Sequence, residues 1–442
     1  MAAAGKRGDL VVAPSAGLRG SASVPGDKSI SHRAVLFGML GQGPTRARRW
    51  LAAGDTEASL RSAQALGVRV ERHSADDLTI HGGLLRPAAG PLDLANAGTG
   101  IRLLAGIMAG QPFASVLDGS EQLRRRPMRR IVEPLRLMGA DISASDERAP
   151  LTIRPAALRG IRYPLPVASA QVKSALLLAG LFARGETAVS QPGPARDHTE
   201  RMLSAMGADI MTEGDTVTLR PGAALLPLDF SVPGDFSSAA FLLVAACIVP
   251  GSDITITGVN LNPTRTGLLD ALLAMGADIA VAEGDQQAGE PAGALRVRHS
   301  ALRGVEIGGD LVVRMIDEFP ALMVAALHAE GQTVVREAQE LRVKETDRIA
   351  VMSAELGRMG AHIGETADGF VIDGPQALAG ALVDSHDDHR VAMSLALAGL
   401  AALAAPGRTV IAGGACAGDS FPGFAATLAA LGGAVAEQEA TA

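Results

Sequence analysis

Cysteine and the large aromatic residues are scarce in this chain, whose 442 residues include 2 cysteines, 1 tryptophan and 1 tyrosine. Cys247 and Cys416 both lie among apolar or small residues, so the sequence implies no disulfide framework and predicts two buried thiols. A reducing cytoplasm fits this cysteine usage. We therefore expect a cytoplasmic protein in which neither thiol has a chemical role.

The sequence also lacks long apolar runs and an excess of positive charge. The longest apolar runs, near 239–249 and 391–405, are too short to span a membrane and predict buried helices. The opening MAAAGKRGD contains no apolar stretch of the kind that a secretory signal needs. With 40 Lys and Arg against 47 Asp and Glu, the net charge of −7 argues against a nucleic-acid or membrane-surface binder. A local basic site inside an acidic protein is still compatible with this balance.

A short pattern recurs six times along the chain. Each copy is a helix-like stretch that ends in Leu or Met, followed by Gly, a small or polar pair and then a branched residue, as in AMGADI. The first glycines are Gly67, Gly139, Gly207, Gly276, Gly360 and Gly432, at spacings of 72, 68, 69, 84 and 72 residues. Glycine accepts the left-handed conformation that ends a helix, and a branched residue favours a strand. The near-even spacing predicts six similar units rather than chance helix stops.

A longer repeat divides the chain into two halves. Residues 23–28 read SVPGDK and residues 231–236 read SVPGDF, and each is followed by Ser and an apolar, helix-like run. Three helix stops follow each copy, which predicts two lobes of three units. The expected lobes are 23–231 and 9–22 plus 232–442, with crossovers near 22–26 and 231–235.

Several segments place polar residues at a turn directly before an apolar helix, where unpaired N–H groups favour an anion. SVPGDKSISHR supplies Lys28, Ser29 and Arg33, although an ordinary capped helix is the alternative and the glycine spacing is not that of a P-loop. In NAGTG, Gly98 allows close approach of a ligand to the backbone. In LRRRPMRR, Arg126 is able to clamp a carboxylate or phosphate, although a solvated arginine run is the alternative.

Later segments add acidic and further basic candidates. Asp317 and Glu318 precede an apolar helix. They either act chemically or only stabilise the positive end of the helix dipole. Lys344 and Arg348 are spaced i, i+4 and predict one shared helix face, with Glu345 beside them. Further candidates are Ser169, Gln171 and Lys173 at a helix start, the PARDHTE segment (194–200), and Arg390 before a long apolar helix. His386 and His389 lack a third ligand and make a weak metal site.

These features have one arrangement in common. If the apolar helices of each half pack in parallel, their N-termini converge, and two such faces meeting across a cleft would form a cationic pocket in an acidic protein. A non-catalytic repeat scaffold would explain the six helix stops. It would not explain why Asp317, Glu345 and five or more cations gather at helix starts.

The motifs resemble those of one enzyme family. SVPGDKSISHR, NAGTG, RRPM, SAQVKS, RDHTE, MIDEFP, LRVKETDR and DHRVAMS occur in this order between residues 23 and 396, and they are similar to the motifs of the 3-phosphoshikimate 1-carboxyvinyltransferases (EPSP synthases). The bacterial class II branch is the most similar. The resemblance implies an α/β fold of two lobes, each with three βαβαββ repeats around a pseudo-threefold axis, forming an inside-out α/β barrel. This agrees with the six-copy repeat.

The resemblance also implies a reaction. The family transfers the enolpyruvyl group of phosphoenolpyruvate to the 5-hydroxyl of shikimate 3-phosphate through a tetrahedral intermediate, giving 5-enolpyruvylshikimate 3-phosphate and phosphate. This is a step of the shikimate pathway to chorismate and aromatic amino acids. The implied enzyme is a monomer with no metal and no organic cofactor, and its partners are small-molecule substrates, without nucleic acid or membrane.

The resemblance assigns roles to residues of this sequence. Those implied for shikimate 3-phosphate are Lys28, Ser29, Arg33, Ser169, Ala170, Gln171, Arg196, Asp317 and Lys344. Those implied for phosphoenolpyruvate are Lys28, Gly98, Arg126, Gln171, Arg348 and Arg390. Asp317 is the implied base for the 5-hydroxyl and Glu345 the implied acid for the methylene carbon, with Lys28 as a third catalytic residue.

One departure and one rival complete the picture. Asp419 stands where many family members carry a lysine that contacts phosphoenolpyruvate. Gly98 leaves room in the NAGTG turn, so glyphosate is expected to compete with phosphoenolpyruvate. The rival shares the fold and acts on UDP-N-acetylglucosamine with a loop cysteine, but neither Cys247 nor Cys416 has a cationic motif beside it.

Overall fold

The computed structural model describes residues 7–404 and 407–439, which divide into two compact units. Unit 1 comprises residues 7–25, 234–285 and the described residues from 291 onward, and unit 2 comprises residues 26–233 and 286–290. The chain passes between the units after Pro25 and after Pro233, inside the ranges that the sequence suggests. Residues 286–290 differ from that division, because they belong to unit 2 rather than to the C-terminal lobe.

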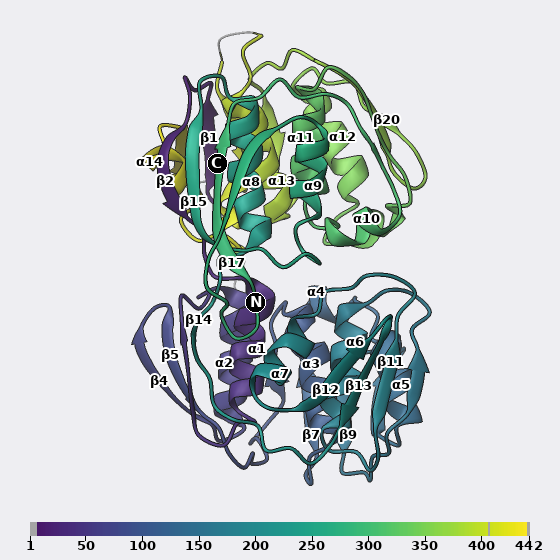
Figure 1. The fold of residues 1–442 in the computed structure, drawn as a ribbon. Coiled ribbons are helices and arrows are strands. Elements are labelled where there is room, and N and C mark those ends of the chain that lie inside the picture. The colour runs from purple at the N-terminus through teal and green to yellow at the C-terminus, as the bar shows by residue number, and fades with distance from the viewer. Residues whose placement is uncertain (1–6, 405–406, 440–442) are drawn as a thin grey trace. The chain divides into compact units, whose positions relative to one another are not determined.

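Unit 2 contains three βαβαββ repeats (Figure 1). The first is β14 (Asp229–Ser231), α1 (Lys28–Gly38), β3 (Pro44–Arg48), α2 (Gly54–Ala65), β4 (Arg69–Ser74) and β5 (Asp77–His81). The second is β6 (Leu92–Asp93), α3 (Gly98–Ala109), β7 (Ser115–Asp118), the short α4 (Glu121–Arg124), α5 (Arg129–Leu137), β8 (Asp141–Ser145) and β9 (Arg148–Arg154). The third is β10 (Arg162–Pro164), α6 (Ala170–Gly180), β11 (Thr187–Ser190), α7 (His198–Ala205), β12 (Asp209–Glu213) and β13 (Thr216–Arg220).

Unit 1 repeats the same order of elements three times. The first repeat is β2 (Arg19–Ser23), α8 (Phe236–Ile248), β15 (Asp253–Asn260), α9 (Gly267–Ala274), β16 (Asp278–Glu283) and β17 (Ala292–Arg298). The second is β18 (Glu306–Ile307), the short α10 (Asp310–Arg314), α11 (Phe319–Leu327), β19 (Gly331–Val335), η1 (Gln339–Val343), α12 (Arg348–Arg358), β20 (Gly364–Glu365) and β21 (Phe370–Gly374). The third is β22 (Leu382–Asp384), α13 (His389–Leu400), β23 (Thr409–Ala412), η2 (Gly414–Asp419), α14 (Phe424–Ala430), β24 (Ala434–Gln438) and β1 (Asp9–Ala13).

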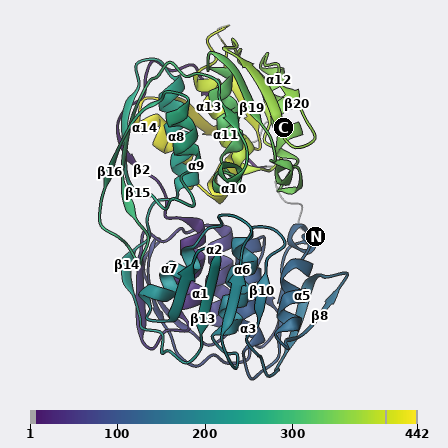
Figure 2. The same ribbon diagram turned by 45° about the vertical axis from the view of Figure 1, so that its right-hand side comes forward.

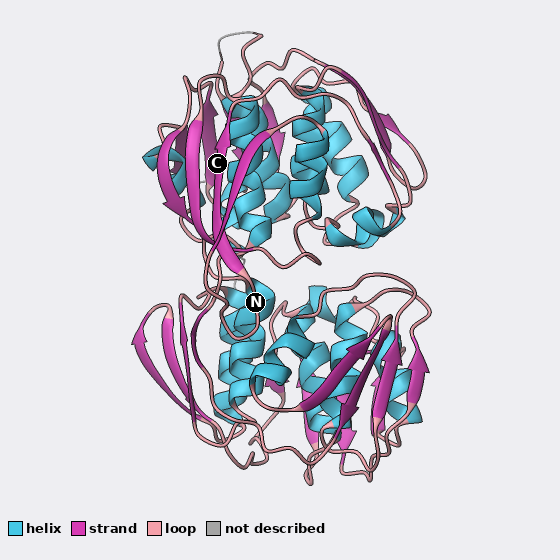
Figure 3. Cartoon of the chain, viewed as in Figure 1, coloured by secondary structure: helices cyan, strands magenta, loops and turns pink. Residues whose placement is uncertain are grey.

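Each repeat forms one four-stranded sheet with a parallel pair at one edge and antiparallel pairs elsewhere, as in the order β6-β7-β9-β8. Distant segments complete three of the sheets. β14 runs parallel to β3, β2 runs parallel to β15, and β1 lies between β23 and β24. In each unit the strands lie outside the buried helices (Figure 3). The predicted two-lobe α/β fold of three repeats each is confirmed.

The six predicted helix stops are present as expected. Gly67, Gly139, Gly207, Gly276, Gly360 and Gly432 have φ values from +84° to +98°. They follow α2, α5, α7, α9, α12 and α14, and each precedes the third strand of its repeat. A residue with a Cβ is strained in this conformation, so glycine is what allows the chain to turn sharply from helix to strand.

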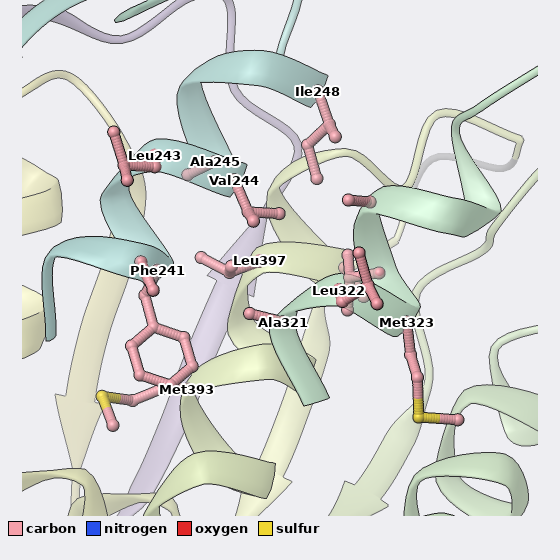
Figure 4. Close-up of a cluster of buried hydrophobic side chains, with 14 of the residues drawn as sticks. Phe241, Leu243, Val244, Ala245, Ile248, Ala321, Leu322, Met323, Met393 and Leu397 are labelled. Carbon is pink, nitrogen blue, oxygen red and sulfur yellow. The ribbon is translucent and has the colours of Figure 1, made fainter. Parts of the chain in front are cut away.

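The core of unit 1 forms around α8, α11 and α13, which lie side by side (Figures 1 and 2). Every residue of α8 is buried, as expected for a helix that is apolar all round. Figure 4 shows Phe241 and Val244 of α8 close to Ala321 of α11 and Leu397 of α13. In unit 2, α1, α3 and α6 are the corresponding buried helices. The two long apolar runs of the sequence are thus the interior helices α8 and α13. No helix within the described ranges is both long enough and apolar enough to cross a membrane.

Candidate active site

The predicted anion-binding segments of unit 2 lie at the N-termini of its buried helices. α1 begins at Lys28, α3 at Gly98 and α6 at Ala170, with Ser169 as its N-cap residue. Two hydrogen bonds join α3 to α6, because Arg102 Nη1 donates to Gln171 Oε1 at 2.7 Å and Gln171 Nε2 donates to Thr99 Oγ1 at 2.9 Å. Ala170 and Gln171 are half-buried, so their exposed atoms and the free N–H groups of the helix start can meet a ligand.

Lys28 forms an ion pair with Asp55, near the start of α2. Burial alone would raise the pKa of Asp55, but the charge and hydrogen bond of Lys28, with smaller effects of His32 and Arg126, hold that pKa below its usual value. Arg126 therefore lies close enough to the Lys28–Asp55 pair to act on it. Asp27 caps α1 by accepting a 3.0 Å hydrogen bond from Ile30 N, which fixes the helix start that carries Lys28.

Gly98 occupies a crowded point in this cluster. A Cβ at this position would lie 2.9 Å from Nη1 of Arg126 and 3.2 Å from Nη1 of Arg102. Its φ lies outside the left-handed region, so the requirement is for space and not for backbone freedom. The glycine therefore lets two guanidinium groups approach the N-terminus of α3.

Arg33 is more deeply buried than its expected role as a ligand for shikimate 3-phosphate suggests. Its Nε donates to Thr199 Oγ1 and its Nη2 donates to Ser174 Oγ, both at 2.9 Å. Burial lowers its pKa to about 10, although Glu200 and other nearby carboxylates oppose the change. Arg33 thus ties α1 to α6 and α7. Arg196 lies close enough to Arg33 to influence the same pKa.

One buried ion pair and one buried histidine–carboxylate contact hold the segment around Arg196. Lys173 Nζ lies 2.5 Å from Glu200 Oε1 and also donates to Gln191 Oε1 at 2.9 Å. His198 Nδ1 lies 2.8 Å from Oε1 of Glu290, which belongs to the 286–290 segment that joins this unit. These contacts fix the start of α7, which begins at His198 within the PARDHTE segment.

In unit 1, the carboxylate of Asp317 is surrounded by three arginines. Its oxygens lie 3.9 Å from Arg265 Nη1, 3.6 Å from Arg348 Nη1 and 3.7 Å from Arg390 Nη2. Arg390 Nη1 also donates a 3.0 Å hydrogen bond to the backbone oxygen of Asp317. Asp317 directly precedes Glu318, the N-cap residue of α11. Three guanidinium groups around one half-buried carboxylate favour its ionised form and leave a strongly cationic neighbourhood.

Arg348 has the most carboxylate partners in this cluster. It is 2 % exposed, and it binds Asp388 through Nε at 2.9 Å and Glu345 through Nη2 at 2.7 Å. Burial would lower its pKa, but the charges of Asp388, Glu345 and Asp317 outweigh burial and raise the pKa above its usual value. The pKa of Asp388, which burial would raise, is held down by Arg348. The pair fixes the guanidinium plane beside Glu345 and Asp317.

The predicted shared helix face of Lys344 and Arg348 is wrong. Lys344 follows the 3₁₀ helix η1 with ψ of −149°, and α12 begins only at Arg348. Asp347 is the N-cap residue of α12, because its carboxylate accepts a 3.1 Å hydrogen bond from Ala350 N. The residues before Asp347 are therefore outside this helix. Lys344 instead pairs with Glu340 at 3.3 Å, and Glu345 lies in the turn between the two helices.

The remaining candidates have other partners. His386 Nε2 lies 3.0 Å from Glu355 Oε1, and among residues 7–404 and 407–439 no cluster of three or more His, Cys, Asp or Glu is placed to hold a metal ion. Cys247 and Cys416 are buried, and burial raises the pKa of each thiol to about 12. Asp419 accepts a 2.7 Å hydrogen bond from Arg7.

Each unit therefore presents cations at the starts of its buried helices, and unit 1 adds two carboxylates that are able to move protons. The family model for EPSP synthase (3-phosphoshikimate 1-carboxyvinyltransferase) matches residues 12–428. The chain belongs to the EPSP synthase family. All eight motifs of the sequence lie within the residues that the family model matches.

Individual members of the EPSP synthase family are similar over nearly the full length. The 3-phosphoshikimate 1-carboxyvinyltransferase of Desulforudis audaxviator is 51% identical over 427 residues, covering 96% of this chain and 99% of its own. That of Geobacter sulfurreducens is 52% identical over 420 residues, covering 94% and 97%. A solved EPSP synthase from Acinetobacter baumannii superposes with a TM-score of 0.89 at 42% identity, covering 98% of this chain and 100% of that one. The enolpyruvyl transferase NikO from Streptomyces tendae has a TM-score of 0.81 at 19% identity, which shows a shared fold. Membership of the class II branch stays a prediction.

The EPSP synthase motifs did not reveal four charged residues that hold the clusters together. Asp55, Arg102, Arg265 and Asp388 pair with Lys28, Gln171, Asp235 and Arg348 respectively. Asp388 stands inside the DHRVAMS motif and Arg102 directly follows NAGTGI, so position within a motif was a usable signal. Asp55 and Arg265 stand alone in sequence, near the starts of α2 and α9, and only their tertiary contacts identify them.

Proposed function

We propose that the protein transfers the enolpyruvyl group of phosphoenolpyruvate to the 5-hydroxyl of shikimate 3-phosphate, and that the two clusters of side chains carry out this reaction. The observation that carries the proposal is the Asp317 carboxylate within 4 Å of three guanidinium groups. Each substrate carries a carboxylate and a phosphate, so bringing them together costs several kcal/mol unless cations neutralise the charge. A base embedded among arginines suits that need.

In the first half of the proposed reaction, Asp317 removes the proton of the 5-hydroxyl of shikimate 3-phosphate. The oxygen of that hydroxyl attacks the enol carbon of phosphoenolpyruvate at the same time. The C=C electron pair takes a proton from Glu345 at the methylene carbon, which becomes a methyl group. The product of this step is a tetrahedral adduct that still carries the phosphate. A positioned acid and base contribute about 10²–10⁴-fold each to such a step.

In the second half, the bond from the tetrahedral carbon to the phosphate oxygen breaks and phosphate leaves. A methyl proton returns to Glu345, the C=C bond forms again in the product, and the proton held by Asp317 passes to the departing phosphate or to solvent. Arg348 and Arg390 are proposed to bind phosphoenolpyruvate together with Gly98, Arg126 and Gln171. The buried Asp388 keeps the Arg348 guanidinium in one orientation for this task.

The other substrate is proposed to be held mainly by side chains of unit 2. Lys28, Ser29, Ser169, Ala170 and Gln171 lie at helix starts, where backbone N–H groups and cations favour a phosphate. Arg33 and Arg196 add charge from the α7 side of the same unit. Lys28 also belongs to the phosphoenolpyruvate set and is a catalytic candidate, because its ammonium group is able to stabilise charge that develops on the transferred group.

The experiment is to mix the protein with phosphoenolpyruvate and shikimate 3-phosphate and to measure phosphate release. The wild type is expected to release phosphate, and Asp317→Asn to lose about 10²–10⁴-fold in kcat while still binding shikimate 3-phosphate. Arg314→Gln is the matched control. It removes a surface ion pair with Asp270 in the same unit and should retain activity. Release with UDP-N-acetylglucosamine in place of shikimate 3-phosphate, or no release with either, would overturn the proposal.

A further inference from the structure

Arg265 lies behind Asp317 and is not part of any of the sequence motifs. It lies in the loop between β15 and α9, two residues before α9 begins, and its side chain is 2 % exposed. Nη2 donates to Asp235 Oδ1 at 2.8 Å and to Ser237 Oγ at 3.0 Å, which anchors the guanidinium to the start of α8. Nη1 lies 3.9 Å from Asp317 Oδ2. One buried cation thus joins the α8 cap to the proposed base.

The two copies of the SVPGD motif show why this cation is present. In unit 2, Asp27 caps α1 and the cation is the next residue, Lys28, which pairs with Asp55 near the start of α2. In unit 1, Asp235 caps α8 but Phe236 follows it, and Phe236 is buried. The cation comes instead from Arg265, near the start of α9. Both units therefore have an ion pair between the starts of the first and second helices of the repeat. In unit 2 the cation is on the first helix, and in unit 1 it is near the second.

Arg265 differs from the other two arginines around Asp317. Arg390 is 13 % exposed and is able to meet a ligand directly, and Arg348, as buried as Arg265, binds the proposed acid Glu345 at 2.7 Å. Arg265 is held on its far side by a carboxylate and a hydroxyl, and Ser237 is itself hydrogen-bonded to the buried Glu318. When a substrate anion binds Arg348 and Arg390 and offsets their positive charge, Arg265 is the cation that stays beside Asp317.

We propose that Arg265 is a positioning residue for Asp317, fixing its carboxylate and keeping it ionised while substrate anions are bound. This rests on the proposed function, in which Asp317 is the base. A fixed cation near 4 Å favours the ionised carboxylate and lowers its pKa, typically by about 1–3 pH units for a close pair. Without it, two incoming substrate anions would raise the pKa of Asp317 and leave less of the base deprotonated.

The test separates the charge of Arg265 from its shape. In Arg265→Gln, the acid limb of the kcat–pH profile should move to higher pH by about one unit, because removing a cation raises the pKa of the base. At neutral pH, kcat should fall about tenfold, with KM for both substrates within about twofold, since the residue touches neither substrate. In Arg265→Lys, the limb should stay at its wild-type pH while kcat falls about threefold, because an ammonium group keeps the charge but not the two-sided hydrogen bonding.

Arg314→Gln is the structural control. Arg314 secures the same loop from outside, donating to Pro263 O at 2.7 Å and to Asp270 Oδ2 at 2.6 Å, so it shares the packing role without approaching Asp317. Its acid limb should match the wild type. If Arg265→Gln does not fold, as judged by circular dichroism and urea unfolding, Arg265→Lys decides, and wild-type kcat in that variant overturns the proposal.

The remaining outcomes are equally distinct. An unshifted acid limb in folded Arg265→Gln, an equal shift in Arg314→Gln, or a loss confined to KM would each overturn the role of Arg265. Activity retained by Asp317→Asn would instead overturn the proposed base, while the phosphate release would still support the proposed reaction. Inactive Asp317→Asn together with an unshifted Arg265→Gln leaves the proposed function standing and removes only this inference.

Discussion

Arg348 Nε donates a 2.9 Å hydrogen bond to Oδ2 of Asp388, and both side chains are almost completely buried. Asp388 is also the N-cap of α13, where it accepts a 2.9 Å hydrogen bond from Arg390 N. One carboxylate therefore holds one proposed phosphoenolpyruvate ligand by its side chain and the other by its backbone. Both arginines depend on it for their positions.

Asp388→Asn should destabilise the protein by about 3 kcal/mol near neutral pH, because it leaves the buried Arg348 guanidinium without its principal counter-charge. Asparagine still caps the helix, so the loss reports mainly on charge. The midpoint of urea unfolding measures it. Asp387→Asn is the control, since Asp387 is exposed and its surface pair with Arg7 should contribute less than about 1 kcal/mol. Equal effects of the two substitutions would contradict the prediction.

The difference between wild type and Asp388→Asn should depend on pH. Arg348 holds the pKa of Asp388 below its usual value in the folded protein, against the effect of burial. The stabilisation is therefore fully present above the unfolded pKa of about 4 and is lost as pH falls through the lower folded value. The gap between the urea midpoints of the two proteins should be constant near neutral pH and should narrow as the pH falls from about 4 to about 3. A gap that stays constant over this range would show that the charge of Asp388 does not cause it.

Gly98→Ala should weaken binding of phosphoenolpyruvate while the protein stays folded. The new methyl group would meet only the ends of two flexible side chains, at 2.9 Å from Arg126 and 3.2 Å from Arg102. These guanidinium groups are able to move aside, which displaces a proposed ligand-binding group rather than the backbone. We expect KM for phosphoenolpyruvate to rise about tenfold, equivalent to about 1.4 kcal/mol, with kcat less affected.

Glyphosate should inhibit the wild type competitively with phosphoenolpyruvate. If Gly98 makes the room that glyphosate needs, Gly98→Ala should raise its inhibition constant by a larger factor than it raises KM. Steady-state phosphate release at several concentrations of both compounds measures the two factors. Undiminished wild-type activity at high glyphosate and low phosphoenolpyruvate would contradict this prediction.

The two thiols should be chemically silent. Burial raises the pKa of Cys247 and of Cys416 to about 12, so near pH 8 only about one thiol in 10⁴ is ionised. Iodoacetamide should modify neither residue in the folded protein and both in urea, as read by mass spectrometry. The double variant Cys247→Ala, Cys416→Ala should keep its activity. Loss of activity in the folded double variant would favour a thiol-dependent reaction instead.

The repeat architecture could be predicted from the sequence because its signal is local. Each of the six helix stops needs a glycine at positive φ, and the requirement is met within one turn of chain. The starts of α1, α3 and α6 were equally accessible, since polar residues followed by an apolar run mark a helix N-terminus. The residues at these helix starts were therefore found without any structure.

Other features depend on contacts between segments that are far apart in the chain. The pairing of Arg265 with Asp235 and Asp317 joins three elements and leaves no periodic pattern. Lys344 and Arg348 were misplaced because their i, i+4 spacing fits one helix, whereas the cap at Asp347 divides the segment in two. The 286–290 segment contains no apolar run, and only tertiary contacts such as those of Glu290 with His198 and of Gly289 with Arg201 explain why it packs with unit 2.

The two N-terminal strands have a consequence for how the protein is made. β2 pairs with β15, and β1 lies between β23 and β24, so both strands pair only with segments that are synthesised after residues 26–233. Residues 26–233 contain nearly all of unit 2, and its last edge strand, β14, ends at Ser231. During synthesis, this unit is therefore able to close its three sheets before β15 is available to pair with β2, and long before β23 and β24 are available to pair with β1.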